Sequence, residues 1–197
     1  MELIRGIHNL KPQHQGCVLT IGNFDGVHRG HQSVLKQLIE KASQLNLPAT
    51  VMTFEPQPLE MIIGDKAPAR LTRLRDKYAA LKDQNIDQLL CVNFNSKFAA
   101  LSADEFITQL LVNKLGVKYL VVGDDFRFGH KRAGDFAMLQ AAGAKYGFDV
   151  VSMDTFSLAQ ARVSSTMVRN ALAQDNLDLA SELLGRPYSI FGKVSHG

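Results

Sequence analysis

Two histidines stand three positions apart inside the glycine-rich segment GNFDGVHRGH, immediately before an amphipathic stretch. At this spacing His28 and His31 lie on one side of a first helical turn. The free N–H groups and positive end of a helix attract anions, and imidazoles add hydrogen-bond donors. Gly22, Gly26 and Gly30 permit tight turns and close approach of the backbone. The pattern favours a phosphate group as the ligand.

Two plainer interpretations of the histidine pair stay open. Asp25 could join the imidazoles as a zinc ligand, although a helix N-terminus disfavours a cation. The histidines could also cap the helix without any chemistry. A P-loop is excluded because no Gly-Lys-Ser/Thr follows, and the dinucleotide pattern GxGxxG is missing as well.

A second group of polar side chains lies in RVSSTMVR. Ser164, Ser165 and Thr166 precede a short helix, and Arg169 lies one turn inside it. Taken alone, the hydroxyls could simply be helix N-caps. Together with the histidine segment, two helix N-termini with hydroxyls, imidazoles and a guanidinium form a cradle for a polyphosphate.

Along the chain, short β-branched runs alternate with amphipathic stretches. This alternation predicts an α/β fold, a Rossmann-like open parallel sheet with helices on both faces. We expect strands at 16–23, 49–54, 88–94, 118–123 and 148–153, and helices at 30–46, 71–84, 134–146, 166–174 and 177–184, with a capping box of Ser102 and Glu105 opening one more.

Three loops interrupt the alternation, at 55–70, 124–133 and 154–165. Each follows a predicted strand. In an open parallel sheet, ligands bind outside the carboxyl ends of the strands. Function is therefore expected at these loops.

The composition is that of a globular domain. The 197 residues are 46% apolar and 21% charged, with a net charge of +3, which excludes a disordered or fibrous chain. No apolar run approaches the roughly 20 residues of a bilayer span, and the N-terminus lacks a secretory signal, so we expect a cytoplasmic protein without membrane contact.

Basic residues are scattered, which disfavours nucleic acid as a partner. Cys17 and Cys91 lie in predicted strands and are expected to be buried free thiols.

The combination of motifs resembles a known family. His28-Arg29-Gly30-His31 looks like the HxGH signature of the nucleotidylyltransferase superfamily, and the hydroxyl segment resembles its second phosphate-binding motif. The set TIGNFDGVHRGH, TFEPQP, GDDFRFG and RVSSTMVR, in this order, is similar to the N-terminal half of bacterial bifunctional FAD synthetases, which join FMN adenylyltransferase and riboflavin kinase. The likeness covers about residues 15 to 197.

The resemblance implies a role for each motif. Catalytic contacts with ATP phosphates fall to His28, His31 and Arg169. Aromatic faces and proline edges could stack on a flavin ring, and Arg127 could meet its phosphate or stack on the ring. ATP-binding residues would be Gly22, Asn23, Asp25, Gly30, Asp125, Ser164, Ser165 and Thr166, while FMN-binding residues would be Phe54, Pro56, Pro58, Phe126, Arg127 and Phe128. The phenylalanines could instead belong to the core, and Asp125 stands where some members carry Asn, so its role stays open.

The reaction implied is ATP + FMN → FAD + pyrophosphate, in line, without a covalent enzyme intermediate and with Mg²⁺. Because the FMN phosphate is already an anion at pH 7, no carboxylate base is required. Residues 1–185 would form the adenylyltransferase domain, and 186–197 look like the opening of a riboflavin kinase barrel, cut short, so that riboflavin phosphorylation is not expected.

Two other functions compete with this one. A transferase of the same fold could use a cytidylyl or pantetheine-phosphate type of reaction, but the aromatic loops argue against it. A non-catalytic flavin or nucleotide sensor is the alternative from another class. Pyrophosphate release on mixing with ATP, Mg²⁺ and FMN would separate catalysis from binding.

Overall fold

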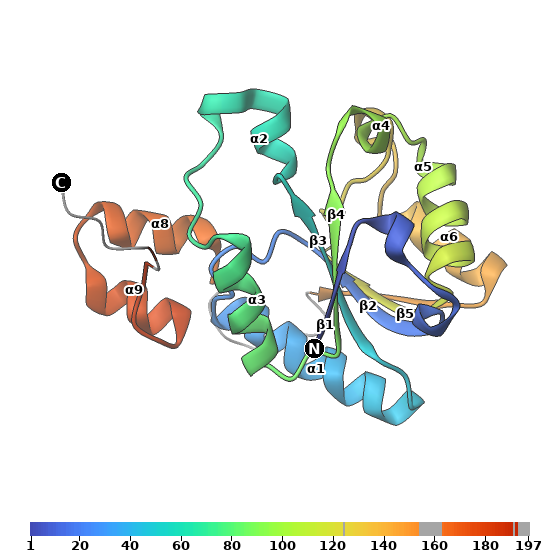
Figure 1. Ribbon diagram of the computed structural model, residues 1–197, viewed down its shortest axis with the longest axis horizontal. Helices are drawn as coiled ribbons and strands as arrows, with labels where there is room; N and C mark the ends of the chain where they lie inside the picture. Colours follow the sequence, from blue (N-terminus) through green and yellow to red (C-terminus); the bar gives the residue numbers. More distant parts are fainter. Residues whose placement is uncertain (124, 154–162, 191, 193–197) are drawn as a thin grey trace.

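Six parallel strands form one open sheet in the computed structural model, which describes residues 1–123, 125–153, 163–190 and 192. Their order across the sheet is β1-β4-β3-β2-β5-β6 (Figure 1). The bounds are β1 (Glu2–Arg5), β2 (Cys17–Ile21), β3 (Ala49–Glu55), β4 (Gln88–Asn93), β5 (Val117–Val122) and β6 (Asp149–Ser152). From β2 the chain first builds outward to β3 and then crosses to β5 on the other side, so the order reverses at β2. Ligands bind at such a switch point.

Helices cover both faces of this sheet, as predicted. Leu35 and Leu38 of α1, with Leu81 of α3, pack on one face, while Leu111 of η4 and Leu139 of α6 pack on the other. The main helices are α1 (Arg29–Leu45), α2 (Pro58–Ile63), α3 (Leu74–Asp83), α4 (Ser96–Ala99), α5 (Ala103–Glu105), which continues into the π-helical η4 (Phe106–Lys114), α6 (Phe136–Tyr146), α8 (Ser165–Ala173) and α9 (Leu177–Leu184). Single 3₁₀ turns lie at η1 (Ile7–Asn9), η2 (Pro12–His14), η3 (Gly64–Lys66) and η5 (His130–Arg132).

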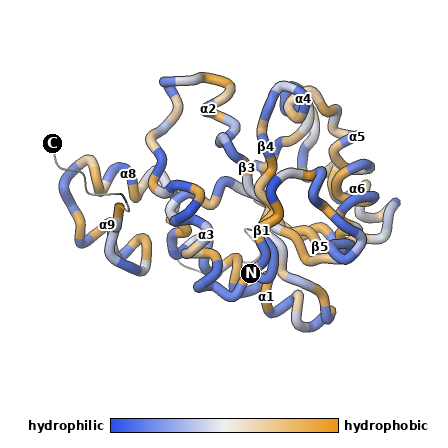
Figure 2. Tube along the Cα trace, in the orientation of Figure 1, coloured by the Kyte–Doolittle hydropathy of each residue, from blue (hydrophilic) through white to orange (hydrophobic). Residues whose placement is uncertain are grey.

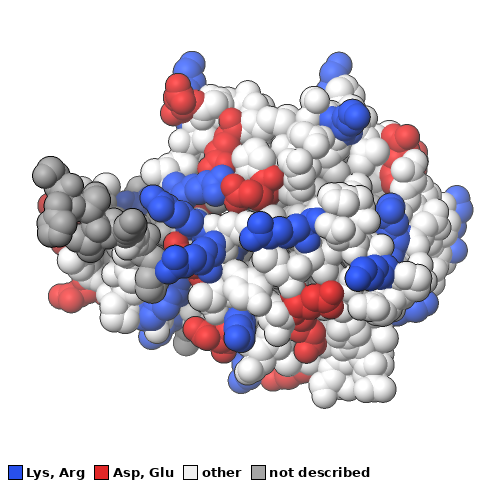
Figure 3. Space-filling view, in the orientation of Figure 1, with Lys and Arg blue, Asp and Glu red and all other residues white. Residues whose placement is uncertain are grey.

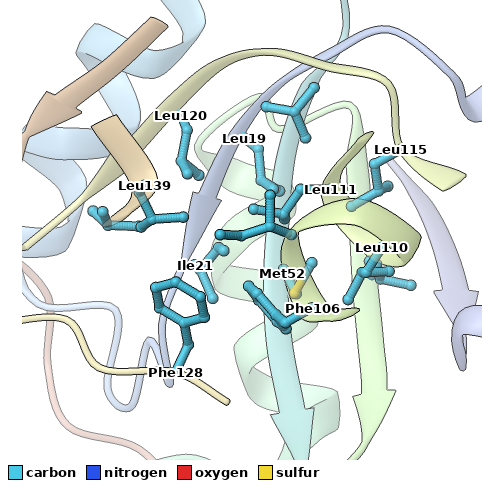
Figure 4. Packing of buried hydrophobic residues seen from close by; sticks show 14 of the residues in the cluster. Leu19, Ile21, Met52, Phe106, Leu110, Leu111, Leu115, Leu120, Phe128 and Leu139 are labelled. Carbon is cyan, nitrogen blue, oxygen red and sulfur yellow. The ribbon is translucent and has the colours of Figure 1, made fainter. Parts of the chain in front are cut away.

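The central strands are apolar because both of their faces are buried. β2 is buried along its whole length, and the strands appear as the hydrophobic centre of the chain in Figure 2. Figure 4 shows Leu19, Met52 and Leu120 of the sheet meeting Phe106 and other side chains of one core. The helices α8 and α9 pack on each other in a smaller cluster that takes in Leu71.

The structure corrects several predicted boundaries. β1 and α2 were not expected at all. The helix predicted at 71–84 begins only at Leu74, because the backbone N–H groups of Leu71 and Thr72 donate to the carboxylate of Asp25. The helix predicted from 134 begins at Phe136, since Asp135 caps it by accepting from the Met138 N–H.

Two predictions from composition can be compared with the structure. Cys17 and Cys91 are buried free thiols, and burial raises the pKa of Cys17 to about 12. None of the helices in the described ranges is long and apolar enough to cross a bilayer. On the face drawn in Figure 3, basic side chains are interspersed with acidic ones.

Candidate active site

The site motifs follow three neighbouring strands. β3, β2 and β5 lie side by side in the sheet, and their carboxyl ends lead into TFEPQP, GNFDGVHRGH and GDDFRFG. The parallel direction of all three strands therefore brings the three segments to one edge. Asp124 and residues 154–162, including Arg162 of the hydroxyl segment, lie outside the described residues.

The two histidines form a stacked pair at the start of α1. Their ring centroids are 3.7 Å apart and their planes differ by 20°. His28 is the N-cap residue, and its Nδ1 accepts from the His31 backbone N–H at 3.3 Å. With Nδ1 an acceptor, a neutral His28 carries its proton on Nε2, which can donate to a ligand. The capping interpretation thus describes His28 correctly, yet leaves this donor available.

The surroundings keep both imidazoles neutral. His28 is only 5% exposed, and burial lowers its pKa to about 4 against the attraction of Asp25. Burial, then the neighbouring His28 and Lys77, lowers the pKa of His31 well below its ordinary value. The Nδ1 atom of His31 is buried and has no hydrogen-bond partner in the described part of the chain. A buried polar atom of this kind costs free energy unless a ligand satisfies it.

Asp25 ties the histidine segment to two distant parts of the chain. Its carboxylate accepts from the backbone N–H groups of Leu71 and Thr72 at 3.0 Å each, and from the Thr72 hydroxyl at 3.1 Å. Arg169 Nη2 donates to Asp25 Oδ2 at 2.5 Å. Asp25 is 2% exposed. Its lone pairs are therefore used inside the protein.

The hydroxyl segment lies against the histidine segment. Ser165 Oγ donates to the Asp25 carbonyl at 2.9 Å, while Ser164 caps α8 by accepting from the Met167 N–H. A side chain at Gly30 would come within 2.8 Å of the Val163 carbonyl, so only glycine allows this approach. Thr166 is exposed in the first turn of α8. The structure thus brings the two predicted phosphate-binding segments together.

Gly22 and Asn23 connect β2 to this turn. The Gly22 N–H donates to the Met52 carbonyl at 3.1 Å, and the Asn23 carbonyl accepts from the Thr53 hydroxyl at 3.3 Å. These bonds hold the segment to the neighbouring strand β3.

Lys77 is a site residue that the sequence analysis missed. It is 1% exposed, and its Nζ donates to the Thr53 hydroxyl at 3.4 Å. Burial lowers the pKa of Lys77, while Asp25 and Glu55 oppose this. A lysine on an amphipathic helix normally marks the solvent face, so no local signal predicted its burial.

The predicted flavin residues divide into core and surface. Phe54 and Phe128 are 8% and 6% exposed and belong to the main core, where Phe128 packs on Phe106 (Figure 4). Phe126 is half-buried and stacks on Phe128 with 5.7 Å between centroids. Arg127 is exposed and donates to the Phe126 carbonyl. Of the three phenylalanines, Phe126 therefore has the most accessible ring.

Asp125 and the two prolines are the remaining residues predicted in these loops. The Asp125 carboxylate bends over Gly123, where a Cβ would lie 2.7 Å from Oδ1. Pro56 follows a cis peptide bond after Glu55, and Pro58 is the first residue of α2. Both prolines are half-buried.

An arginine holds the loop that contains α2. Arg70 binds Glu55 through Nη1 and Nη2 at 3.0 and 2.7 Å, and also binds Glu60. These hydrogen bonds raise the pKa of Arg70 and lower that of Glu60. α2 stands away from the sheet in Figure 1 and exposes four large apolar side chains, those of Leu59, Met61, Ile62 and Ile63.

The described residues contain no group of three or more His, Cys, Asp or Glu side chains able to hold a metal ion. A zinc site made by the two histidines with Asp25 is therefore not formed there. A cavity of about 390 Å³ lies at the opposite edge of the sheet, near Lys118 and Asp149 at the beginnings of β5 and β6.

The chain is similar in sequence to proteins of one known family. The family model for FAD synthetase matches residues 10–167. The bifunctional riboflavin kinase/FMN adenylyltransferases of Escherichia coli (strain K12) and Haemophilus influenzae are 60% and 56% identical over the whole chain, which covers 63% and 64% of their lengths. The chain thus spans a little under two thirds of these relatives.

One solved structure is also similar. It is described as a macrolide-efflux protein from Streptococcus pneumoniae, is 26% identical, and superposes with a TM-score of 0.76 over 95% of this chain and 63% of its own.

Proposed function

The chain belongs to the FAD synthetase family, and from this premise we propose that it transfers the adenylyl group of ATP to FMN. An oxygen of the FMN phosphate attacks the α-phosphorus of ATP. The bond from that phosphorus to the bridging oxygen breaks, and pyrophosphate leaves as FAD forms. The observation that carries the proposal is the meeting of the α1 and α8 starts around the Asp25 backbone.

Catalysis in this scheme is mainly electrostatic. The nucleophile is already an anion, so the protein must position two phosphates and stabilise the charge that develops on the leaving pyrophosphate. The donors proposed for this are the imidazoles of His28 and His31 and the start of α1. Arg169 shares its guanidinium with Asp25, so its contribution is expected through the arrangement of that pair.

Neutral imidazoles suit a site that binds a polyanion. Two charged rings stacked at 3.7 Å would repel each other before any ligand arrived. A bound triphosphate raises the pKa of both rings, so each can hold a proton more tightly as negative charge develops. Each 1.4 kcal/mol of such stabilisation is worth about a tenfold gain in rate.

The flavin half of the proposal depends on apolar surface near charged groups. Phe126 offers a half-buried ring and Arg127 an exposed guanidinium beside it. The apolar side chains of α2 supply further surface for a planar ring system. With the flavin ring in this place, the FMN phosphate would point toward the carboxyl ends of β2 and β5.

Magnesium is proposed to arrive with ATP. Mg²⁺ is usually held by substrate phosphates, water and one or two carboxylates, and when bound it neutralises phosphate charge. The carboxylate of Asp25 is occupied by protein donors, whereas Asp125 is exposed, so of these two described carboxylates Asp125 is the one that could contact a hydrated cation.

The test is chromatographic detection of FAD after incubation with ATP, Mg²⁺ and FMN, with pyrophosphate measured in parallel. GTP and CTP serve as nucleotide controls, and riboflavin replaces FMN as the acceptor control. We expect equal amounts of FAD and pyrophosphate from the mixture of ATP, Mg²⁺ and FMN, and no such products from the mixtures with GTP, CTP or riboflavin. Binding of both ligands without pyrophosphate release would refute the proposal in favour of a sensor.

A further inference from the structure

The turn that precedes α1 has a costly backbone conformation. Phe24 and Val27 have positive φ values of 48° and 42°, and Gly26 between them has 83°. Residues other than glycine rarely have a positive φ, and a β-branched residue such as valine adopts one least readily. Such a conformation persists only where the surrounding structure holds it.

Part of what holds the turn comes from the end of the described chain. Arg186 Nη2 donates to the Gly26 carbonyl at 2.7 Å, and Nη1 donates to the carbonyls of Val27 and Leu184 at 3.2 and 3.3 Å. The Gln32 side-chain amide donates to the same two carbonyls, at 2.9 Å to Val27 and 2.8 Å to Leu184. The arginine is separated from the turn by 160 positions in the sequence.

Apolar packing and a hydroxyl complete this support. A side chain at Gly26 would meet Leu71 at 2.9 Å and Leu184 at 3.3 Å, so the turn is pressed between α9 and the segment before α3. The Gly26 N–H donates to the Thr72 hydroxyl at 3.0 Å. The end of α9 and the residue after Gly185 are thus part of the wall of the turn.

Fixing the Val27 carbonyl also fixes the next N–H group. In a trans peptide, the C=O and the following N–H point in opposite directions. The Val27 carbonyl points toward Arg186 and Gln32, so the His28 N–H points away from them, at the N-cap of α1 where an anion would bind. The same bonds set the backbone from which the His28 ring projects.

We infer that Arg186 is a positioning residue for the phosphates of ATP, acting through the backbone of Gly26 and Val27. This rests on the proposed function. Arg186 lies one residue past the expected end of the transferase domain at 185, so residues just beyond that boundary would also shape the transferase site.

The experiment compares Arg186→Ala, Arg186→Lys and the control Arg5→Ala, an exposed arginine on the edge strand β1, in the full chain. Amide hydrogen exchange is followed in peptides covering 22–30 and 117–122. For Arg186→Ala we expect exchange to rise about tenfold in the first peptide and not in the second, because a charged donor to the turn is lost. This readout does not depend on any catalytic activity.

Steady-state kinetics then test the consequence for function. We expect the KM for ATP to rise about tenfold in Arg186→Ala, with the KM for FMN unchanged and partial recovery in Arg186→Lys, whose ammonium can reach fewer carbonyls. Unchanged exchange at 22–30 overturns the inference, and so does faster exchange with an unaltered KM for ATP. If the wild-type chain makes no FAD, the proposed function fails, while the exchange result still decides whether Arg186 holds the turn.

Discussion

The carboxylate of Asp25 and the guanidinium of Arg169 lie 2.5 Å apart, Oδ2 to Nη2, although 144 positions separate them in the chain. Asp25 is buried and Arg169 is 23% exposed. The pair joins the turn after β2 to helix α8, and the same carboxylate orders the residues before α3. One side chain therefore connects three separate segments.

Asp25→Asn should cost about 3 kcal/mol of unfolding free energy, because it removes the charge facing Arg169 and offers one carbonyl oxygen where two carboxylate oxygens now accept. Urea unfolding measures this, with the exposed Asp65→Asn as the control. A double-mutant cycle with Arg169→Ala should give a coupling energy of about 1 kcal/mol or more. A coupling near zero would mean that the two side chains act independently.

His31→Ala should lower kcat for FAD formation at least tenfold, by about 1.4 kcal/mol or more, and raise the KM for ATP by a smaller factor. The reason is that a donor aimed at developing charge contributes most in the transition state. Initial rates over a range of ATP concentrations separate the two parameters. His8→Ala, at an exposed histidine, is the control. A kcat within twofold of the wild type would exclude this role.

Phe126→Ala and Phe128→Ala should behave differently. Phe128 is in the core, so its truncation is expected to cost about 3 to 4 kcal/mol and to reduce binding of ATP and FMN alike. Phe126 is half-buried, so its truncation should weaken FMN binding, followed by quenching of flavin fluorescence, while ATP binding and the urea midpoint change little. Equal loss of both ligands in Phe126→Ala would count against a flavin contact.

The stability of the protein should fall as the pH is lowered from 6.5 toward 4. The folded-state pKa of His28 is about 4 and its ordinary value is 6.5, so the unfolded chain binds a proton first. The stabilisation is present above pH 6.5 and is lost as the pH falls, by on the order of 3 kcal/mol. His28→Asn should lose less stability than wild type over this interval in urea titrations. Parallel curves for the two proteins would contradict the prediction, and His130→Asn, at an exposed ring, is the control.

Lys77→Met should stabilise the protein while impairing FAD formation. The lowered pKa of Lys77 means that burial destabilises its ammonium group more than Asp25 and Glu55 stabilise it. Methionine fills a similar volume and carries no charge to be desolvated. We expect a higher urea midpoint and a lower kcat, since a buried cation near His31 supports the proposed phosphate site. Lys82→Met, at an exposed position of the same helix, should change neither. Unchanged kcat would assign Lys77 no part in catalysis.

The alternation of strands and helices was predictable because most strands are apolar runs and most helices carry a helical hydrophobic periodicity. Helix α1 has Val34, Leu35 and Leu38 on one face, and β2 is apolar throughout. β1 was missed because four residues at a sheet edge, with only Ile4 buried, make too short a pattern. α2 was missed because its six residues make fewer than two helical turns, which is too short a stretch for a helical periodicity to be recognised.

The chemistry available to the protein follows from local sequence patterns, since the imidazoles, hydroxyls and glycines occur in short motifs in the loops that follow the strands. The use of these groups depends on long-range contacts: Asp25 accepts from Thr72 and Arg169, Lys77 is buried, and Arg186 holds Gly26 and Val27. Periodicity indicates which face of an element is buried, whereas the partner of a polar side chain depends on the order of the strands in the sheet. Segments 46 to 160 positions apart meet at one sheet edge, and no local pattern specifies that contact.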